Sequence, residues 1–151
     1  SGDLGISVDG VADVMVRMAN CCKPVPGDEI LGYISLGRGI TVHRDDCPNA
    51  KALLRSPERF TSVTWTGPAK RSFNVELAID GWDRPRMLED LSRAVAEAGA
   101  NIVTATCSVD DQMARTRFTV DIGDIEGLRQ LIASLRNVDG VFDAYRVTPG
   151  N

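Results

Sequence analysis

The sequence has few aromatic side chains and only one histidine. Aromatic residues make up 5% of its 151 residues, so aliphatic side chains must supply most of the buried area. No apolar run approaches the ~18 residues that a membrane-spanning helix needs, and no leader-like segment opens the chain. With 43% hydrophobic and 25% charged residues, the composition is typical of a folded globular chain. We expect a cytoplasmic protein without membrane contact.

Recognisable catalytic motifs are also missing. The sequence contains no glycine-rich phosphate loop, no HExxH pair and no nucleophile elbow, so no reaction can be assigned. Four cysteines are too few for a disulfide-dense scaffold of this length, which favours a metal site or reduced thiols. The chain begins Ser1-Gly2 without a methionine, and we therefore expect further sequence upstream.

A Gly-Pro breaker divides the chain into two halves of different charge. Up to Arg71 there are nine Lys and Arg residues against eight Asp and Glu, and from Ser72 onward there are eight against thirteen. The acidity therefore belongs to the second half. The predicted organisation is a first module over residues 8–66, a linker over 67–71 and a second domain over 72–148.

The second half predicts an α+β domain with a ferredoxin-like order of elements. Apolar residues alternate as in strands or repeat at helical spacing in the order strand, helix, strand, strand, helix, strand: 72–79, 87–98, 101–109, 114–122, 128–135 and 141–147. We expect Asp83 to cap the first helix, Pro85 to lie in its first turn and Gly99 to end it. Cys107 is expected in the core.

The first helix of this domain suggests an anion site. We expect the loop 80–87 to lie near the start of the second strand, at Asn101 and Ile102. The free amides at the N-terminus of the helix would favour an anion there, such as an amino-acid carboxylate. Every helix has such an end, so a capped helix with nothing bound is the alternative.

The first half carries a more specific cluster of ligand-type residues. Cys21 and Cys22 precede a turn at Pro26-Gly27, and predicted strands 30–36 and 39–43 lead to His43, with Cys47 four residues later. Three thiols and an imidazole form a tetrahedral zinc site if the backbone turns between the adjacent cysteines. Zinc is expected on Cys22, His43 and Cys47, with Cys21 as the fourth ligand or merely buried. Reduced, packed thiols beside a surface histidine are the alternative.

These motifs resemble a known family. The segments CCKPVPGD (residues 21–28), GRGI (37–40) and VHRDDC (42–47) closely resemble the conserved-cysteine or zinc-finger module of long RelA/SpoT homologues, the bacterial stringent-response enzymes that make and degrade (p)ppGpp. The segment from Ser72 onward resembles their ACT domain. The resemblance implies the C-terminal regulatory region of such a synthetase/hydrolase, a β-hairpin and helix module followed by an ACT domain. Nothing in this sequence resembles the hydrolase or synthetase domain of that family, so we expect this chain to regulate and not to catalyse. The parent enzyme is expected to use Mg and Mn in the absent domains.

The resemblance also implies partners. Such a region senses amino-acid starvation through ribosomal RNA and the bound tRNA and regulates the upstream catalytic domains of its own chain. Arginine and lysine suit phosphate contact, and the candidates are Arg17, Lys23, Arg38 and Arg44. The near-neutral charge of the module leaves a set of surface ion pairs as the alternative.

The ACT segment departs from the pattern of amino-acid-binding relatives at one position. Asp83-Arg84-Pro85-Arg86-Met87-Leu88 has Arg86 where the family pattern has a glycine that lets a ligand approach the backbone. Branched-chain amino-acid binding would involve Asp83, Arg84, Arg86, Met87, Asn101 and Ile102, and the Arg86 side chain argues against it. The other function classes are a homodimerising ACT module, with 141–147 as the pairing edge, and a free-standing zinc-binding interaction protein.

Overall fold

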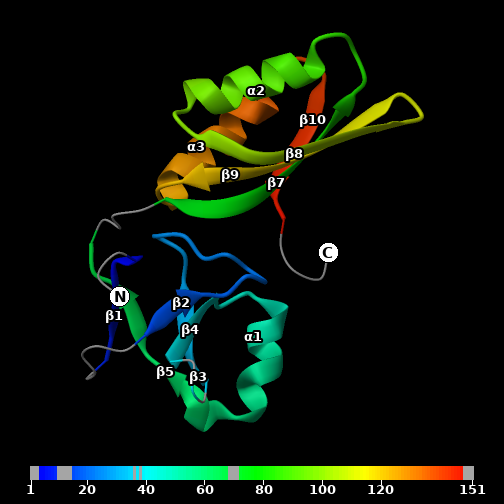
Figure 1. The fold of residues 1–151 in the computed structure, drawn as a ribbon. Coiled ribbons are helices and arrows are strands. Elements are labelled where there is room, and N and C mark those ends of the chain that lie inside the picture. The colour runs from blue at the N-terminus through cyan, green and yellow to red at the C-terminus, as the bar shows by residue number, and fades with distance from the viewer. Residues whose placement is uncertain (1–3, 10–14, 36, 38, 68–71, 148–151) are drawn as a thin grey trace. The chain divides into compact units, whose positions relative to one another are not determined.

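The computed structural model describes residues 4–9, 15–35, 37, 39–67 and 72–147 (Figure 1). The described chain divides into two compact units, the first ending at Ser72 and the second spanning Phe73–Val147. Apart from Gly67, the predicted linker lies outside the described residues, as does residue 148. None of the described helices has the length and apolar character needed to cross a bilayer.

The first unit is built on a four-stranded sheet with the order β2-β4-β3-β5. Its strands are β2 (Val16–Met18), β4 (Gly39–Arg44), β3 (Ile30–Ser35) and β5 (Phe60–Thr61). β2 runs parallel to β4, and the other neighbours are antiparallel. A separate antiparallel pair joins β1 (Ile6–Val8) to β6 (Val63–Trp65). The short helix α1 (Pro48–Ala52) and the 3-10 turns η2 (Leu53–Arg55) and η3 (Pro57–Arg59) lead from β4 to β5.

The predicted hairpin of this unit is confirmed by β3 and β4, although Leu36 and Arg38 of its connection lie outside the described residues. Gly39 opens β4 with a φ of +78°, and a side chain there would collide with the Met15 carbonyl. The Ile40 amide donates to that same carbonyl at 2.8 Å. Glycine is thus what lets the chain entering β2 approach β4.

The second unit has the predicted βαββαβ order. Its antiparallel sheet has the order β10-β7-β9-β8, formed by β10 (Val141–Arg146), β7 (Phe73–Trp82), β9 (Met113–Ile122) and β8 (Asn101–Asp110). Helices α2 (Met87–Glu97) and α3 (Ile125–Arg136) lie together over one face of the sheet (Figure 1). The core between the sheet and the helices contains fully buried side chains from β7, β9, α2 and α3: Leu77, Phe118, Leu91 and Leu131. Each such side chain stabilises the fold by about 1.5–3 kcal/mol.

The β8–β9 hairpin is confirmed, with a tight two-residue turn. Asp111 and Gln112 have φ values of 50° and 68°, the left-handed pair that matches the twist of the flanking strands. The end of α2 is also confirmed, because Gly99 follows its last turn with a φ of +78°.

Two predicted boundaries are wrong. β7 does not break after Ile79, because Asp80, Gly81 and Trp82 continue the ladder against β9. Asp83 does not cap α2, and Pro85 is not in its first turn. The Asp83 amide instead donates to the Gln112 carbonyl at 2.7 Å, which extends the sheet region and delays the helix until Met87.

The prediction of a core position for Cys107 is also wrong, since Cys107 is exposed. β8 is an edge strand, and Ala105 and Val109, which lie on the same face of the strand as Cys107, are exposed as well. The strand-like sequence pattern alone predicted a buried face for these residues. In the structure, the end of β8 extends beyond the part of the sheet that the two helices cover (Figure 1).

The residue that takes the cap position of α2 has an unfavourable backbone conformation. Arg86 has a φ of 68°, which L-residues with a Cβ adopt at a cost, and its side chain pairs only with exposed Glu89. We expect Arg86→Gly to raise the denaturation midpoint of the second unit. The converse change, Gly99→Ala, places a Cβ in open space at a φ of +78° and should destabilise by about 1 kcal/mol. Urea denaturation of both variants tests this, and a midpoint lowered by Arg86→Gly would contradict it.

Candidate metal centre

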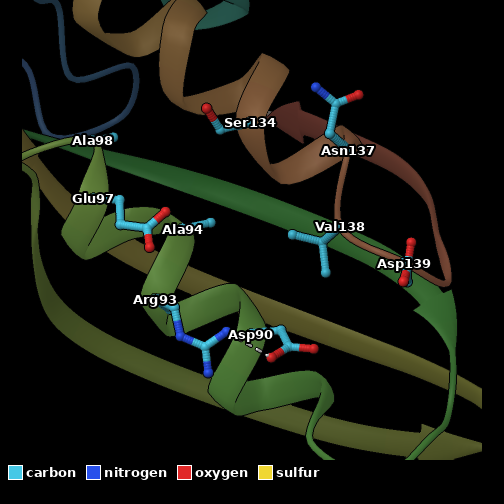
Figure 2. A pocket seen from close by; sticks show the side chains of 9 residues that line it. All are labelled: Asp90, Arg93, Ala94, Glu97, Ala98, Ser134, Asn137, Val138 and Asp139. Carbon is cyan, nitrogen blue, oxygen red and sulfur yellow. Dashed lines mark hydrogen bonds and ion pairs between the residues drawn. The ribbon is translucent and has the colours of Figure 1, made fainter.

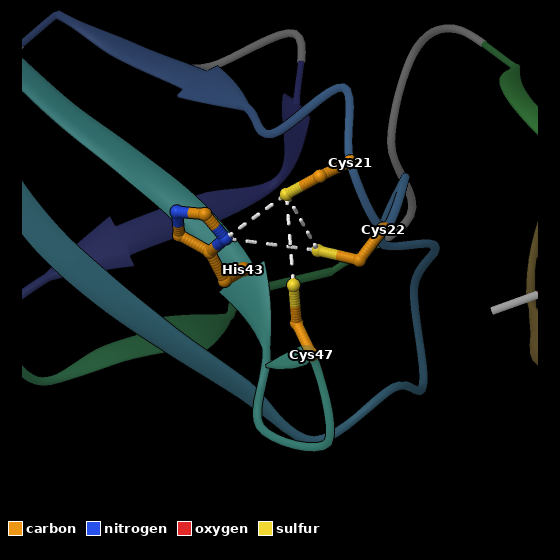
Figure 3. A group of neighbouring side chains, drawn as sticks. All are labelled: Cys21, Cys22, His43 and Cys47. Atoms are coloured by element: carbon orange, nitrogen blue, oxygen red, sulfur yellow. Dashed lines mark hydrogen bonds between the residues drawn. The ribbon is translucent and has the colours of Figure 1, made fainter. Parts of the chain in front are cut away.

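Cys21 and Cys22 lie in a turn that directly follows β2. The Lys23 amide donates to the Ala19 carbonyl at 3.0 Å, and Lys23 itself has a φ of 46°. This turn removes the alternation that an extended strand would impose on the two adjacent thiols. Both side chains point to the same place, where they meet His43 and Cys47 (Figure 3). The turn that the zinc hypothesis required is therefore present.

The strand register brings His43 and Cys47 to that turn. Met18 pairs with Val42, and the Ala19 amide donates to the Val42 carbonyl at 2.9 Å, so the turn begins beside His43. Cys47 then follows through a tight bend, in which its amide donates to the Arg44 carbonyl at 3.1 Å, and it stands immediately before α1.

The distances between the four ligand atoms match a tetrahedral site. Cys21 Sγ lies 3.5 Å from both His43 Nδ1 and Cys47 Sγ, and Cys22 Sγ lies 3.8 Å from His43 Nδ1. The two adjacent sulfurs are 4.0 Å apart, and all four atoms lie within 4.8 Å of one another. Ligands held at about 2.0–2.3 Å from one zinc ion lie roughly 3.5–3.8 Å apart. A disulfide would need about 2.05 Å, and all four cysteines are free. The donor set of three sulfurs and one nitrogen fits zinc.

Burial and hydrogen bonding shift the pKa values of these side chains in different directions. Burial lowers the pKa of His43, which keeps its imidazole neutral and able to bind a metal. Burial also raises the pKa of Cys22 far above its usual range, although the Arg44 amide donates to its sulfur at 3.3 Å. At Cys47 burial acts in the same direction, but the amides of Ala50 and Asn49 and the neighbouring thiols outweigh it and lower the pKa. Because a metal must displace the thiol protons, its binding strengthens as the pH rises.

The predicted RNA-contacting residues differ in their availability. Arg17 is exposed on the edge strand β2, where its Nε donates to Thr41 Oγ1 at 3.2 Å, and Lys23 is half-buried directly after Cys22. Arg44 follows His43, but its side chain is only 11% exposed and pairs with Asp46 at 2.6 Å. Its Nη1 is buried with no hydrogen-bond partner. Arg38 lies outside the described residues.

The predicted amino-acid site of the second unit is not assembled. Asn101 pairs with Asp121, which pairs with Asn74, so Asn101 and Ile102 lie at the end where β7 begins. Asp83 and the start of α2 lie at the other end, about 30 Å along a ten-residue strand. The expectation that they lie close together is wrong, because α2 carries the chain back along the sheet before β8 starts.

Near that helix start, Arg84, Arg86 and Met87 have partners within the protein. Arg84 donates to the Asp139 carbonyl at 2.8 Å and pairs with Asp90 at 2.9 Å. Arg86 pairs with Glu89, and Met87 is 5% exposed. Arg84 thus fastens the start of α2 to the loop that precedes β10, instead of facing a ligand.

A hollow of about 510 Å³ lies between α2 and α3 (Figure 2). Its charged lining consists of three carboxylates, Asp90, Glu97 and Asp139, and one cation, Arg93. Arg93 already pairs with Asp90 at 3.1 Å and with Glu89 at 3.0 Å. An amino-acid carboxylate would meet mostly like charge here, and none of the predicted contact residues lines this hollow.

The sequence reasoning missed Arg115 and Arg117 on β9. They are exposed, whereas Ala114, Thr116 and Phe118 between and beside them are buried. The sequence contains a pattern that could have revealed them, because arginine alternates with apolar or small residues along this strand. Such alternation directs both guanidinium groups to the face of the sheet opposite the helices.

Zinc stoichiometry tests the metal centre. The chain purified without added metal should hold about one zinc ion, and Cys47→Ser should lower the affinity by more than about 100-fold in competition with a chromogenic chelator. Exposed Cys107 provides the matched control, because Cys107→Ser removes a thiol from the second unit. The assignment would be contradicted if the two variants lost zinc affinity equally, or if the wild-type chain took up no zinc.

Comparisons with known proteins identify both units. Residues 6–66 match the family model of the RelA/SpoT RIS domain, and residues 69–146 match that of the ACT domain. Among solved structures, the ACT domain from a GTP pyrophosphokinase of Chlorobium tepidum aligns with a TM-score of 0.47 at 24% identity, covering 50% of this chain and 99% of that one.

Relatives of the whole chain are longer proteins. A bifunctional (p)ppGpp synthase/hydrolase RelA of Mycobacterium tuberculosis is 42% identical over 147 residues, which cover 97% of this chain and 20% of that protein. A GTP pyrophosphokinase of Streptomyces antibioticus is 41% identical over 149 residues, which cover 98% of this chain and 18% of that protein. The chain thus spans about a fifth of the length of these curated relatives. The resemblance seen in the cysteine and ACT motifs is confirmed. The chain belongs to the RelA/SpoT family and consists of a RIS domain followed by an ACT domain.

Proposed function

We propose that this chain is the regulatory part of a stringent-response (p)ppGpp synthetase/hydrolase, which senses amino-acid starvation by contacting ribosomal RNA and the bound tRNA. It performs no catalysis itself and acts on catalytic domains elsewhere in the same cytoplasmic protein. The observation that carries the proposal is the convergence of Cys21, Cys22, His43 and Cys47 within 4.8 Å in a unit that matches the RIS model. We propose residues 8–66 and 72–148 as the two functional domains.

Zinc has a structural role in this proposal. The buried cluster around the candidate ligands is made of the small side chains Ala19, Cys22, Cys47 and Ala50, so it offers little apolar area at the point where the turn after β2 meets α1. A zinc ion that joins the turn after β2 to the end of β4 and the start of α1 supplies the missing stability. It thereby fixes the backbone that carries the neighbouring cations.

Those cations are the proposed RNA contacts. Lys23 and Arg44 are the residues immediately after the ligands Cys22 and His43, and Arg17 precedes the ligand turn on the exposed edge strand β2. Arg17, Lys23 and Arg38 are proposed to bind phosphate groups directly, with Arg44 contributing least because it is mostly buried and ion-paired. Recognition of folded RNA by shape and a few phosphate contacts does not require a strongly basic domain.

Ribosome co-sedimentation tests this contact. The double variant Arg17→Ala/Lys23→Ala should weaken association about tenfold and make it less dependent on salt, because two phosphate contacts are lost. Lys51→Ala/Arg55→Ala removes two exposed positive charges from α1 and η2 of the same unit and serves as the matched control. The proposal fails if both double variants bind like the wild type at moderate salt, or if only the control loses binding.

A homodimer formed through the ACT domain is a second candidate, supported by the edge strand β8. All of its residues except Ile102 are exposed, and it carries no charged residue before Asp110. A long neutral edge is a template for pairing with another strand. The edge expected from the sequence, β10, carries Asp143 and Arg146 and is shorter. We therefore favour β8 as the pairing edge.

Light scattering over a range of concentrations tests the dimer. A mass that rises from monomer to dimer should be observed, and Ala105→Lys should abolish the rise by placing a charge in the middle of β8. Ala105→Thr is the control, because it keeps the edge neutral and favours a strand. A monomer at every concentration would exclude pairing by this chain.

A further inference from the structure

The face of the ACT sheet opposite α2 and α3 carries a hollow that the proposed function does not use. It measures about 410 Å³, within the range of about 300–1,000 Å³ typical of small-molecule sites. The side chains that argue for a site here come from all four strands: Asp80, Thr106, Ser108, Arg115, Arg117 and Tyr145.

The strand register places these residues in two adjacent rows across the sheet. In the first row Tyr145 pairs with Ala78, Ala78 with Arg117, and Arg117 with Thr106. In the second row exposed Asp143 lies opposite Asp80, Asp80 lies opposite Arg115, and Arg115 lies opposite Ser108. Neighbouring strands are about 4.8 Å apart, so Tyr145 and Arg117 border the hollow from opposite sides of Ala78, separated by about 10 Å.

Both arginines are free to bind a ligand. Within the described part of the chain, the side chains of Arg115 and Arg117 make no hydrogen bond and no ion pair. Asp80 stands directly opposite Arg115, yet the two charges form no ion pair. Opposite charges at such positions usually pair, so this hollow holds three uncommitted charged groups.

The remaining lining residues give the hollow a floor and an aromatic wall. Ala78 is 5% exposed, and the strand register places its small side chain between Tyr145 and Arg117, on the face opposite α2 and α3. Tyr145 is 41% exposed and offers a ring for stacking. Thr106 and Ser108 contribute hydroxyl groups on the side of β8.

We propose that this hollow binds a nucleoside phosphate. Arg115 and Arg117 take the phosphate, because two neighbouring guanidinium groups suit an anion with several acceptor oxygens. Tyr145 stacks on the base, and Asp80 accepts hydrogen bonds from base N–H groups. The lining holds two arginines and one aspartate, and Asp143 lies opposite Asp80 just outside it, so the positive charge that favours an anion is concentrated at Arg115 and Arg117. The site is independent of the metal centre.

Titration calorimetry of the purified 151-residue chain tests the site without ribosomes. The probes are GTP, inorganic phosphate, a single-stranded RNA hexamer of mixed sequence, and valine. GTP should bind saturably, and Arg115→Ala/Arg117→Ala should weaken it at least tenfold. Tyr145→Leu should weaken GTP several-fold without changing the affinity for inorganic phosphate. Arg93→Ala/Arg129→Ala, which removes two positive charges from α2 and α3, is the matched control and should bind GTP like the wild type.

The probes also separate the sources of the ligand. If the hexamer binds through the same two arginines more tightly than GTP, the nucleoside phosphate belongs to an RNA strand; if GTP binds more tightly, it is a free nucleotide. The proposal is overturned if GTP does not bind, if the control and the Arg115/Arg117 variants lose equal affinity, or if inorganic phosphate binds as tightly as GTP. Binding of valine in place of GTP would overturn it as well. None of these outcomes depends on zinc or ribosome binding.

Discussion

The parallel pairing of β2 with β4 is the constraint on which the first unit depends. Met18 beside Val42 fixes the point at which β2 ends, and the turn closed by Lys23 and Ala19 then brings two thiols to the imidazole at the end of β4. A shift of this register by one residue would move His43 to the other face of the sheet and separate it from the sulfurs. Gly39 permits this pairing, since only a residue without a Cβ fits beside the Met15 carbonyl.

The proposed zinc ion and the protein chain would stabilise each other in this arrangement. Three buried or half-buried thiols and a neutral imidazole lie within 4.8 Å of one another, and the fully buried side chains of the cluster around them are small, so ordering the four groups in one place is costly. A bound cation would offset this cost, because its bonds to the thiolates and the imidazole hold the four groups together. The cluster is thus best understood as the part of the fold that positions the surrounding surface, including Arg17 and Lys23.

Much of this could be predicted from the sequence where local patterns decide the structure. The βαββαβ order followed from apolar periodicity, and the convergence of the four candidate ligands followed from their spacing and the Pro26-Gly27 turn. Failures arose where tertiary structure decides. Cys107 has a strand pattern typical of a buried face, but the helices do not extend over it. Asn101 was placed beside Asp83 because the path of α2 along the sheet was neglected. The hollow at Arg115 and Arg117 depends on the pairing of four strands, and no local pattern contains that information.

The most direct test of the metal centre is X-ray absorption spectroscopy at the zinc edge on the intact chain. The account predicts a first shell of three sulfur atoms at about 2.3 Å and one nitrogen at about 2.0 Å, supplied by Cys21, Cys22, Cys47 and His43. A shell dominated by oxygen, or one with fewer than three sulfurs, would contradict the assignment of this cluster as the centre that organises the RIS domain.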